Sequence, residues 1–398
     1  MRLLIVTSSY PSPFYEAAGS FVREMARLLA QRGHDVFVLT PHTPGAALRE
    51  MRDGVSIRRF RYAWPANSQT LAGGRGGIMP RLRKSWHARA QVPGLVIGFY
   101  FGLRKMLAEA NFDRVLAHWI IPAGIVTRVI CVSKKIPFSV FTPGSEFTAF
   151  GGKLVPLLRP VVADAHEIYA ASEYVIDLIE SSCSPRFIDF FPMAVNLPDF
   201  PYAASREFAD PLKLLVVGRL VDWKGTAFAI EAMRILRDRK IGARLTIVGD
   251  GPTAPRLRQL TQSLGLNDAV LFSVDITHQA LVDLYHQADI FLQPSIKISG
   301  QETEGLGVTL LEAQASGSNV IASRVGGIPT AVVDGETGLL VPPQDANAIA
   351  NAVMTLYRDP ILRTRLREAG RARIEERFDW GTLIARLETQ LEKRERIR

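Results

Sequence analysis

Two passages of the sequence share one plan, and this repetition constrains the fold more than any other feature. Residues 2–40 contain an apolar strand pattern, a loop that holds Gly19, an amphipathic helix pattern and a second strand pattern. Residues 212–251 repeat this plan, with Gly218 and Gly225 in the first loop. Strand–helix–strand units of this kind open parallel sheets, and short β-rich segments alternate with helical patterns after each one. The sequence therefore predicts an α/β fold with two doubly wound, Rossmann-like domains.

The length of the chain agrees with two domains, because 398 residues exceed what one ordinary core accommodates. Four prolines between residues 192 and 211 indicate a connector. We therefore expect an N-terminal domain at 1–205 and a second domain that begins at 206. Open parallel sheets bind ligands at the carboxyl ends of their strands, so the sequence predicts a ligand cleft between the two domains.

Composition excludes several classes of protein. The chain is 47% hydrophobic and 22% charged, which is typical of soluble globular proteins. Its cysteines, Cys131 and Cys183, are too few for a disulfide framework or a cysteine-rich zinc site. The first apolar run is too short for a signal peptide, and the longest, of about 12 residues, is shorter than the ~20 that a membrane helix needs. We expect a cytoplasmic protein.

Positive charge is concentrated in one stretch of the N-terminal half. From Arg58 to Lys105 the sequence contains ten basic residues and no acidic one, interleaved with aromatic side chains such as Trp64 and Trp86. A solvated surface is the ordinary interpretation of such a run. The aromatic residues favour a surface that contacts anionic lipid, at the inner face of the cytoplasmic membrane. Nucleic acid is a weaker alternative, because no recognisable nucleic-acid module accompanies the stretch.

The segment VVGRLVDWKG places two cations directly after a buried strand pattern. Arg219 and Lys224 follow Gly218 in a loop that leads into a helix pattern. Backbone amides, a helix N-terminus and two cations at one place are suited to a diphosphate. Two surface cations beside a turn are the alternative. The sequence lacks GxGxxG, GxxxxGK[ST] and Asp-x-Asp motifs, so it predicts no dinucleotide cofactor and no metal ion.

The segment EGLGVTLLE, residues 304–312, has a carboxylate at each end. Glu304 is expected in a loop just before a helix, where Gly305 and Gly307 let the backbone approach a ligand. Glu312 is expected about one turn inside that helix, where a buried carboxylate needs hydrogen-bond donors. A ribose would supply two hydroxyls to Glu312, and a sugar would supply hydroxyls to Glu304. A neighbouring arginine for Glu312 and solvent for Glu304 are equally consistent with the spacing.

These motifs resemble the donor-binding segment of glycosyltransferase family 4. The resemblance lies in EGLGVTLLEA and the following SGSNVIASRVGGIPTAVVDGETGLLVPP, in GRLVDWKG, in GSFVREMARLLAQRGHDVFVLTP and in RFDWGTLIARLETQL. Members are retaining enzymes of the GT-B fold. The resemblance implies a donor-binding domain at 206–378 and a C-terminal helix, 379–398, that crosses back to the N-terminal domain.

The resemblance also implies roles for individual residues. Arg219 and Lys224 would bind the donor diphosphate. Glu304 would hold the hydroxyls of the donor sugar and Glu312 the ribose. The other residues that would line the donor are Gly19, Gly144, Glu146, Gly218, Gly305, Leu306 and Gly307.

The N-terminal half departs from the family pattern at two places. The family commonly carries a His-Gly-x-Asp segment, whereas this chain reads TPGSEF, with Pro143 in place of the histidine and Glu146 in place of the aspartate. The first loop keeps Gly19 alone where the family has a glycine pair. His118 and Trp119 follow a strand pattern and are candidates for acceptor contacts, with a buried structural histidine as the alternative for His118.

The sequence thus predicts a retaining, metal-independent hexosyltransferase that needs no cofactor. Its donor would be a UDP- or GDP-sugar, and its acceptor a glycan, a polyprenyl-diphosphate-linked sugar or a glycolipid in cell-surface polysaccharide or glycolipid synthesis. Two alternatives remain: a sugar phosphorylase or a sucrose- or trehalose-type synthase on the same fold, and a catalytically silent subunit that binds sugar nucleotides.

Overall fold

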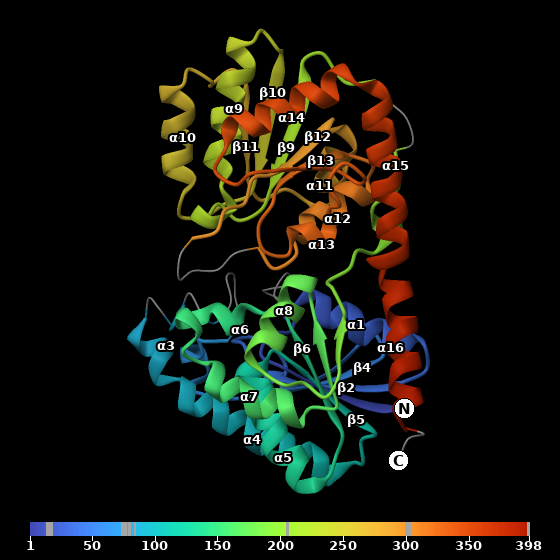
Figure 1. Ribbon diagram of the computed structural model, residues 1–398. Helices are drawn as coiled ribbons and strands as arrows, with labels where there is room; N and C mark the ends of the chain where they lie inside the picture. Colours follow the sequence, from blue (N-terminus) through green and yellow to red (C-terminus); the bar gives the residue numbers. More distant parts are fainter. Residues whose placement is uncertain are drawn as a thin grey trace. The chain divides into compact units, whose positions relative to one another are not determined.

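The computed structural model describes residues 1–12, 19–72, 78, 81–82, 85–203, 207–298 and 304–395 (Figure 1). Part of the basic stretch, including Arg83 and Lys84, lies outside the described residues. The chain forms two compact units. The first contains residues 1–171 and 175–191, and the second contains residues 172–174 and 192–398. The expected boundary near residue 205 and the expected assignment of residues 379–398 to the N-terminal domain stay predictions.

In the described residues of the first unit, an eight-stranded sheet has the order β3-β4-β2-β1-β5-β6-β7-β8. All neighbours are parallel except β3 and β4, which pair antiparallel. β1 lies between β2 and β5, so the strands that follow β1 in sequence are added first on one side of it and then on the other. The topological switch point therefore lies between β1 and β5. The strands are β1 (Arg2–Thr7), β2 (Asp35–Pro41), β3 (Arg49–Arg52), β4 (Val55–Phe60), β5 (Arg114–His118), β6 (Phe138–Thr142), β7 (Glu167–Ala170) and β8 (Ile188–Phe190).

Helices of the first unit connect these strands and cover the sheet. α4, α5 and α7 lie side by side on it (Figure 1). The helices are α1 (Ser20–Gln31), α3 (Trp86–Ala90), α4 (Val92–Glu109), α5 (Ile125–Lys134), α6 (Ser145–Thr148), α7 (Val155–Asp164) and α8 (Glu173–Ser182), with a π-helical turn η2 (Ile120–Gly124) and 3₁₀ turns η1 (Ala66–Ser68) and η3 (Ala149–Gly152). α8 begins in residues that belong to the second unit.

The second unit holds a six-stranded sheet among its described residues, with the order β11-β10-β9-β12-β13-β14 and every neighbouring pair parallel. β9 lies between β10 and β12, which places this sheet's switch point between β9 and β12. The strands are β9 (Leu212–Val217), β10 (Ala243–Val248), β11 (Val270–Ser273), β12 (Ile290–Gln293), β13 (Asn319–Ser323) and β14 (Leu339–Val341).

Helices alternate with these strands along the second unit. They are α9 (Thr226–Asp238), α10 (Ala254–Ser263), α11 (His278–Gln287), α12 (Val308–Ala315), α13 (Ile328–Ala331), α14 (Ala346–Arg358), α15 (Pro360–Arg377) and α16 (Trp380–Glu395), with 3₁₀ turns η4 (Leu197–Asp199) and η5 (Asp222–Lys224). The prediction of two Rossmann-like α/β domains is confirmed. The apolar strand segments form the cores because their side chains are almost fully buried, as at Leu214, Ile247 and Ile290.

Among the described residues, no helix combines the length and the apolar character that crossing a bilayer requires.

Candidate active site

The loop after β9 is held against the end of β12 by close backbone contacts. Gly225 has a φ of 64°, and a Cβ on it would lie 2.0 Å from the carbonyl oxygen of Pro294. Ile296 donates its backbone N–H to the carbonyl of Trp223 at 2.8 Å. Only glycine permits this approach at residue 225, so the two loops at the switch point, and the side chain of Lys224 with them, are fixed in one place.

Lys224 and Glu304 form an ion pair at this switch point. The Nζ atom of Lys224 donates to Oε2 of Glu304 at 2.7 Å, and the two side chains are 14% and 9% exposed. The ammonium also lies 4.8 Å from the ring centroid of Trp223. The same Glu304 oxygen accepts from Gln293 at 2.9 Å and from Ser295 at 3.3 Å. The sequence-predicted cation and carboxylate therefore meet in a largely desolvated network.

Arg219 lines the same small pocket as Lys224. Arg219 is exposed, and its side chain makes no ion pair within the part of the chain that the structure describes. The hydroxyl of Thr226, the first residue of α9, is buried and has no hydrogen-bond partner there. The pocket is lined by Val216, Val217, Gly218, Arg219, Lys224, Thr226, Gln293 and Pro294. Two cations, an unpartnered hydroxyl and the N-terminus of α9 favour an anionic ligand.

The EGLG loop lies directly before α12, as the sequence predicts, and it is packed tightly against the loop that holds Gly327. Gly307 caps α12 with a φ of 87°, a conformation that favours glycine. Gly327 donates its N–H to the carbonyl of Glu304 at 2.9 Å, and a Cβ on Gly327 would lie 1.8 Å from the carbonyl of Gly305. Leu306 is buried. This packing sets Glu304 directly before the free N–H groups at the start of α12.

Glu312 is the fifth residue of α12, and its partner is a tyrosine. The hydroxyl of Tyr285, on α11, donates to Oε2 of Glu312 at 2.6 Å. Burial raises the pKa of Glu312 to about 7, although the hydrogen bond from Tyr285 acts in the opposite direction. Burial and the neighbouring carboxylate also raise the pKa of Tyr285. Glu312 therefore changes charge near neutral pH, with one oxygen fixed by Tyr285.

In the first unit, Gly19 and His118 lie near the carboxyl ends of β1 and β5. Gly19 caps α1 with a φ of 77°, and a Cβ on it would lie 2.3 Å from the carbonyl of Ser9. His118 is buried and stacks on Phe141 with ring centroids 4.6 Å apart, and neither of its ring nitrogens has a partner among the described residues. Burial lowers the pKa of His118 to about 3, so the ring is neutral at neutral pH.

Glu146 bonds to the backbone of the turn that follows β5, directly after Trp119. Trp119 has a φ of 66°, which is unusual for a bulky residue. Oε1 of Glu146 accepts from the backbone N–H of Ile120 at 3.0 Å, and Oε2 accepts from Thr142 at 3.1 Å. Burial raises the pKa of Glu146. Gly144 has a φ of 86°, and a Cβ on it would lie 2.5 Å from Cγ2 of Val175. The contacts of Glu146 and Gly144 thus hold the fold of their own unit.

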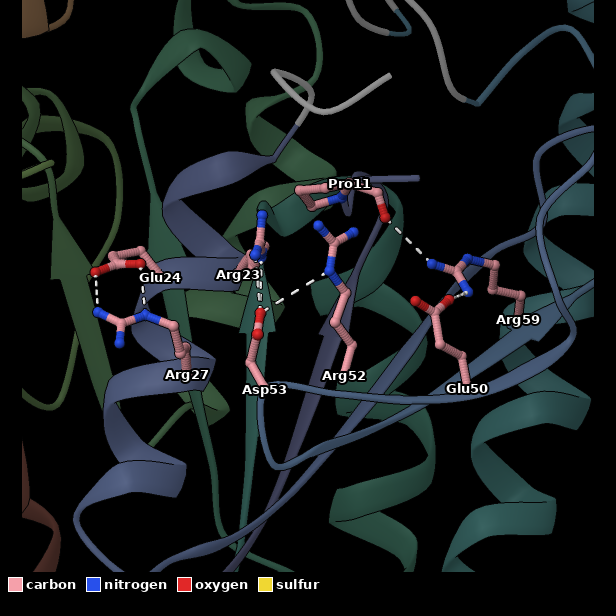
Figure 2. A network of polar contacts seen from close by, with 8 residues as sticks. All are labelled: Pro11, Arg23, Glu24, Arg27, Glu50, Arg52, Asp53 and Arg59. Carbon is pink, nitrogen blue, oxygen red and sulfur yellow. Dashed lines mark hydrogen bonds and ion pairs between the residues drawn. The ribbon is translucent and has the colours of Figure 1, made fainter. Parts of the chain in front are cut away.

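Arginines anchor the start of the loop after β1 in the same unit. Arg59 donates to the carbonyl of Pro11 at 3.1 Å and pairs with Glu50 at 2.5 Å, as Figure 2 shows. Arg23 pairs with Asp53 at 2.9 Å on the other side of the network. The bond from Arg59 holds the start of the loop at Pro11, and the pair of Arg23 joins α1 to the turn between β3 and β4.

Two family models match the chain. "Glycosyl transferases group 1" matches residues 202–373, and "Glycosyl transferase 4-like domain" matches residues 17–186. A GDP-mannose-dependent monoacylated alpha-(1-6)-phosphatidylinositol monomannoside mannosyltransferase of Corynebacterium glutamicum is 31% identical over 74% of this chain and 80% of its own length. The chain belongs to the group 1 glycosyltransferases.

Other similar proteins extend over nearly the whole of this glycosyltransferase. A glycogen synthase of Mycobacterium tuberculosis is 28% identical over 96% of the chain and 92% of its own length. A sucrose-phosphate synthase structure from Thermosynechococcus elongatus superposes with a TM-score of 0.79, at 21% identity, over the full length of both chains. The superposition agrees with the expected GT-B fold.

The described residues of the glycosyltransferase contain no group of three His, Cys, Asp or Glu side chains placed to hold a metal ion. The structure brings Arg219, Lys224, Glu304 and the EGLG glycines together in the second unit, with Glu312 on the helix that follows. It places Gly19, Gly144, Glu146, His118 and Trp119 in the first unit. The roles given to these residues stay predictions.

The sequence did not reveal four side chains that hold the carboxylates of Glu304 and Glu312, directly or through a neighbour: Gln293, Ser295, Thr309 and Tyr285. Gln293 is the last residue of β12, and its amide joins Glu304 to Thr309. A polar residue that ends an otherwise apolar strand, as in IFLQPS, was the available signal. Tyr285 carried none, because its contact with Glu312 spans 27 residues.

Proposed function

We propose that this glycosyltransferase moves a sugar, with retention of configuration and without a metal ion, from a nucleoside diphosphate sugar to an acceptor hydroxyl. The Lys224–Glu304 ion pair carries the proposal. It places a cation for a diphosphate beside a carboxylate for sugar hydroxyls, at the switch point where open sheets bind ligands. In a nucleotide sugar the phosphate and the sugar are adjacent, so one donor molecule would contact both Lys224 and Glu304.

Charge on the leaving diphosphate is the main electrostatic demand of the reaction. As the bond between the anomeric carbon and the phosphate oxygen breaks, the sugar gains oxocarbenium character and the diphosphate gains negative charge. Lys224, held by Glu304, and the amides at the start of α9 and α12 are in place before the reaction, and the exposed Arg219 lies at the same pocket, so these groups stabilise that charge with little reorganisation. Glu312 accepts hydrogen bonds from the ribose. No residue is assigned as a covalent nucleophile.

The donor is tested by thermal-shift screening against UDP-, GDP- and ADP-sugars. A donor at a hundred times its dissociation constant stabilises the folded protein by about 2.7 kcal/mol. The C. glutamicum relative is GDP-mannose-dependent by name, which makes GDP-mannose the first candidate. Product analysis then determines the anomeric configuration. An inverted product would contradict retention, and an absence of stabilisation by every nucleotide sugar would contradict the proposal as a whole.

We further propose that the acceptor is lipid-linked and that the first unit docks on an anionic membrane surface. α3 and α4 expose Trp86, Ile97 and Phe101, which are 72%, 54% and 64% accessible. Arg104 and Lys105 are exposed on the same helix as Ile97 and Phe101. Exposed apolar side chains beside cations suit a headgroup layer, where each cation contributes about 1 kcal/mol within a Debye length of the surface.

Vesicle co-sedimentation at low and high salt tests the docking surface. The double variant Ile97→Ser/Phe101→Ser should leave the pellet of anionic vesicles and still bind the donor. Leu271→Ser/Val274→Ser is the matched control, because these exposed apolar residues lie in the second unit and should not affect sedimentation. Wild-type protein that stays in the supernatant at low salt would contradict docking. A soluble glucan, suggested by the glycogen synthase relative, would then be the better acceptor.

A further inference from the structure

The two oxygens of Glu304 have different surroundings. Oε2 accepts three hydrogen bonds, from Lys224 at 2.7 Å, Gln293 at 2.9 Å and Ser295 at 3.3 Å. Within the described ranges, no hydrogen bond reaches Oε1. Three donors on one oxygen fix the rotation of the carboxylate, which leaves the other oxygen as the one able to accept from a ligand.

Gln293 is an uncharged, buried member of this network with hydrogen bonds at both ends of its amide. It is 2% exposed. Its Nε2 donates to Glu304 and to the hydroxyl of Ser295 at 3.1 Å, and its Oε1 accepts from the hydroxyl of Thr309 at 3.1 Å. A flipped amide would set its oxygen against the carboxylate of Glu304. The carboxylate and Thr309 therefore specify one orientation of the amide.

The elements that meet at Gln293 are also those expected to contact the donor. Gln293 ends β12, Thr309 lies in the first turn of α12, and Gln293 lines the pocket together with Lys224 and Arg219. Because the buried amide of Gln293 bonds both to Thr309 at the start of α12 and to Glu304, it holds the carboxylate in a fixed position relative to α12. It also holds Glu304 when Lys224 turns some of its hydrogens toward a phosphate.

We propose that Gln293 is a positioning residue for the donor sugar. Thr309 orients its amide, the amide fixes Oε2 of Glu304, and Oε1 is thereby presented to a sugar hydroxyl. The inference rests on the proposed function and deepens it, because it assigns the positioning of the sugar-binding carboxylate of Glu304 to a relay of neutral side chains. The relay should affect only one part of the donor. Binding of the sugar depends on the relay, and binding of the nucleoside diphosphate does not.

Calorimetric titration of matched ligands tests the relay. The probes are the nucleotide sugar that the thermal-shift screen selects and the corresponding nucleoside diphosphate without sugar. Gln293→Met keeps the length of the side chain and removes both polar ends. We expect this variant to bind the nucleotide sugar about tenfold more weakly, as for the loss of one hydrogen bond to a charged group. Its affinity for the nucleoside diphosphate should change less than about twofold.

Two further variants keep the test decisive. Thr309→Val replaces the hydroxyl that orients the amide with a methyl group of similar size. It should therefore lower the affinity for the nucleotide sugar relative to the nucleoside diphosphate by a smaller factor, and it provides the test even where Gln293→Met folds poorly. Gln279→Met is the control, because the amide of Gln279 donates to the exposed Asp283 on α11, away from the pocket. It should leave both affinities unchanged.

The result that overturns the relay is an equal loss for both ligands, or no loss for either, in Gln293→Met and Thr309→Val. A wild-type protein that binds the nucleoside diphosphate and its sugar conjugate with equal affinity would also overturn it. A wild-type protein that binds neither probe would overturn the proposed function itself.

Discussion

Each of the two sheets has a topological switch point, and the two switch points carry different kinds of side chain. Between β9 and β12 the second unit gathers charge: Lys224 meets Glu304, and Arg219 lines the same pocket. Between β1 and β5 the first unit gathers aromatic rings: His118 stacks on Phe141 and contacts Phe21 at 5.7 Å between centroids. The same topology thus supports a charged edge in one unit and an aromatic edge in the other.

The difference bears on the proposed function, which needs cations at the edge that holds the donor diphosphate. In the second unit, polar groups remain available to a ligand, as the buried hydroxyl of Thr226 illustrates. In the first unit, the buried carboxylate of Glu146 accepts hydrogen bonds from Ile120 and Thr142 of its own unit. Buried polar atoms without a partner among the described residues occur at both edges, at Thr226 in the second unit and at the ring nitrogens of His118 in the first. The edges differ in charge, because only the second combines such an atom with the cations Lys224 and Arg219 in one pocket.

The largest effect should follow from removing the cation of the charged edge. Lys224→Ala should lower kcat by about 100- to 1,000-fold, because a preorganised group that stabilises the leaving charge is lost. Steady-state kinetics would measure this. Lys213→Ala is the control, since Lys213 is an exposed lysine on β9. A loss of less than tenfold in Lys224→Ala would mean that the diphosphate is stabilised elsewhere.

Replacing the second carboxylate should have an intermediate effect that depends on pH. The pKa of Glu312 is about 7, and the proposed function has its carboxylate accept from the ribose, so the donor affinity of the wild type should rise between pH 6 and 8. Glu312→Gln should bind the donor about tenfold more weakly at pH 8 and show no such rise. Titration at several pH values checks both, and the exposed Glu368→Gln serves as control.

The same pKa gives a stability test with a definite sign. The folded-state pKa of Glu312 lies above its ordinary value of 4.5, so the folded protein binds this proton more tightly than the unfolded chain does. Wild-type stability should therefore fall as pH rises from about 5 through 7. Glu312→Gln lacks this loss and should gain in Tm relative to the wild type at pH 8. An unchanged Tm difference between pH 5 and 8 would refute the raised pKa.

The smallest effect is expected at the aromatic edge. His118→Phe should change Tm by less than about 2 °C and leave donor affinity unchanged, because the ring is neutral, its nitrogens have no partner in the described part of the chain and its stacking on Phe141 is retained. Thermal melts and donor titration measure this. A fall in donor affinity would remove the contrast between the two edges, whereas a raised KM for the acceptor alone would support the predicted acceptor contact.

The sequence predicted the fold and the positions of the charged residues because both have local signals. Strand patterns separated by glycine-bearing loops indicated two α/β domains, and EGLGVTLLE placed Glu304 before a helix and Glu312 inside it. The partners of these carboxylates have no local signal. Tyr285 and Gln293 reach them from other elements, and only the folded sheet order brings those elements together.

The central claim is that fixed cations take the place of a metal ion at the donor diphosphate. Sugar transfer measured in the presence of excess EDTA, with and without added manganese, tests it most directly. The account predicts undiminished transfer in EDTA by the wild type and none of the lost activity restored by manganese in Lys224→Ala. Complete loss of wild-type transfer in EDTA, recovered on adding manganese, would contradict it.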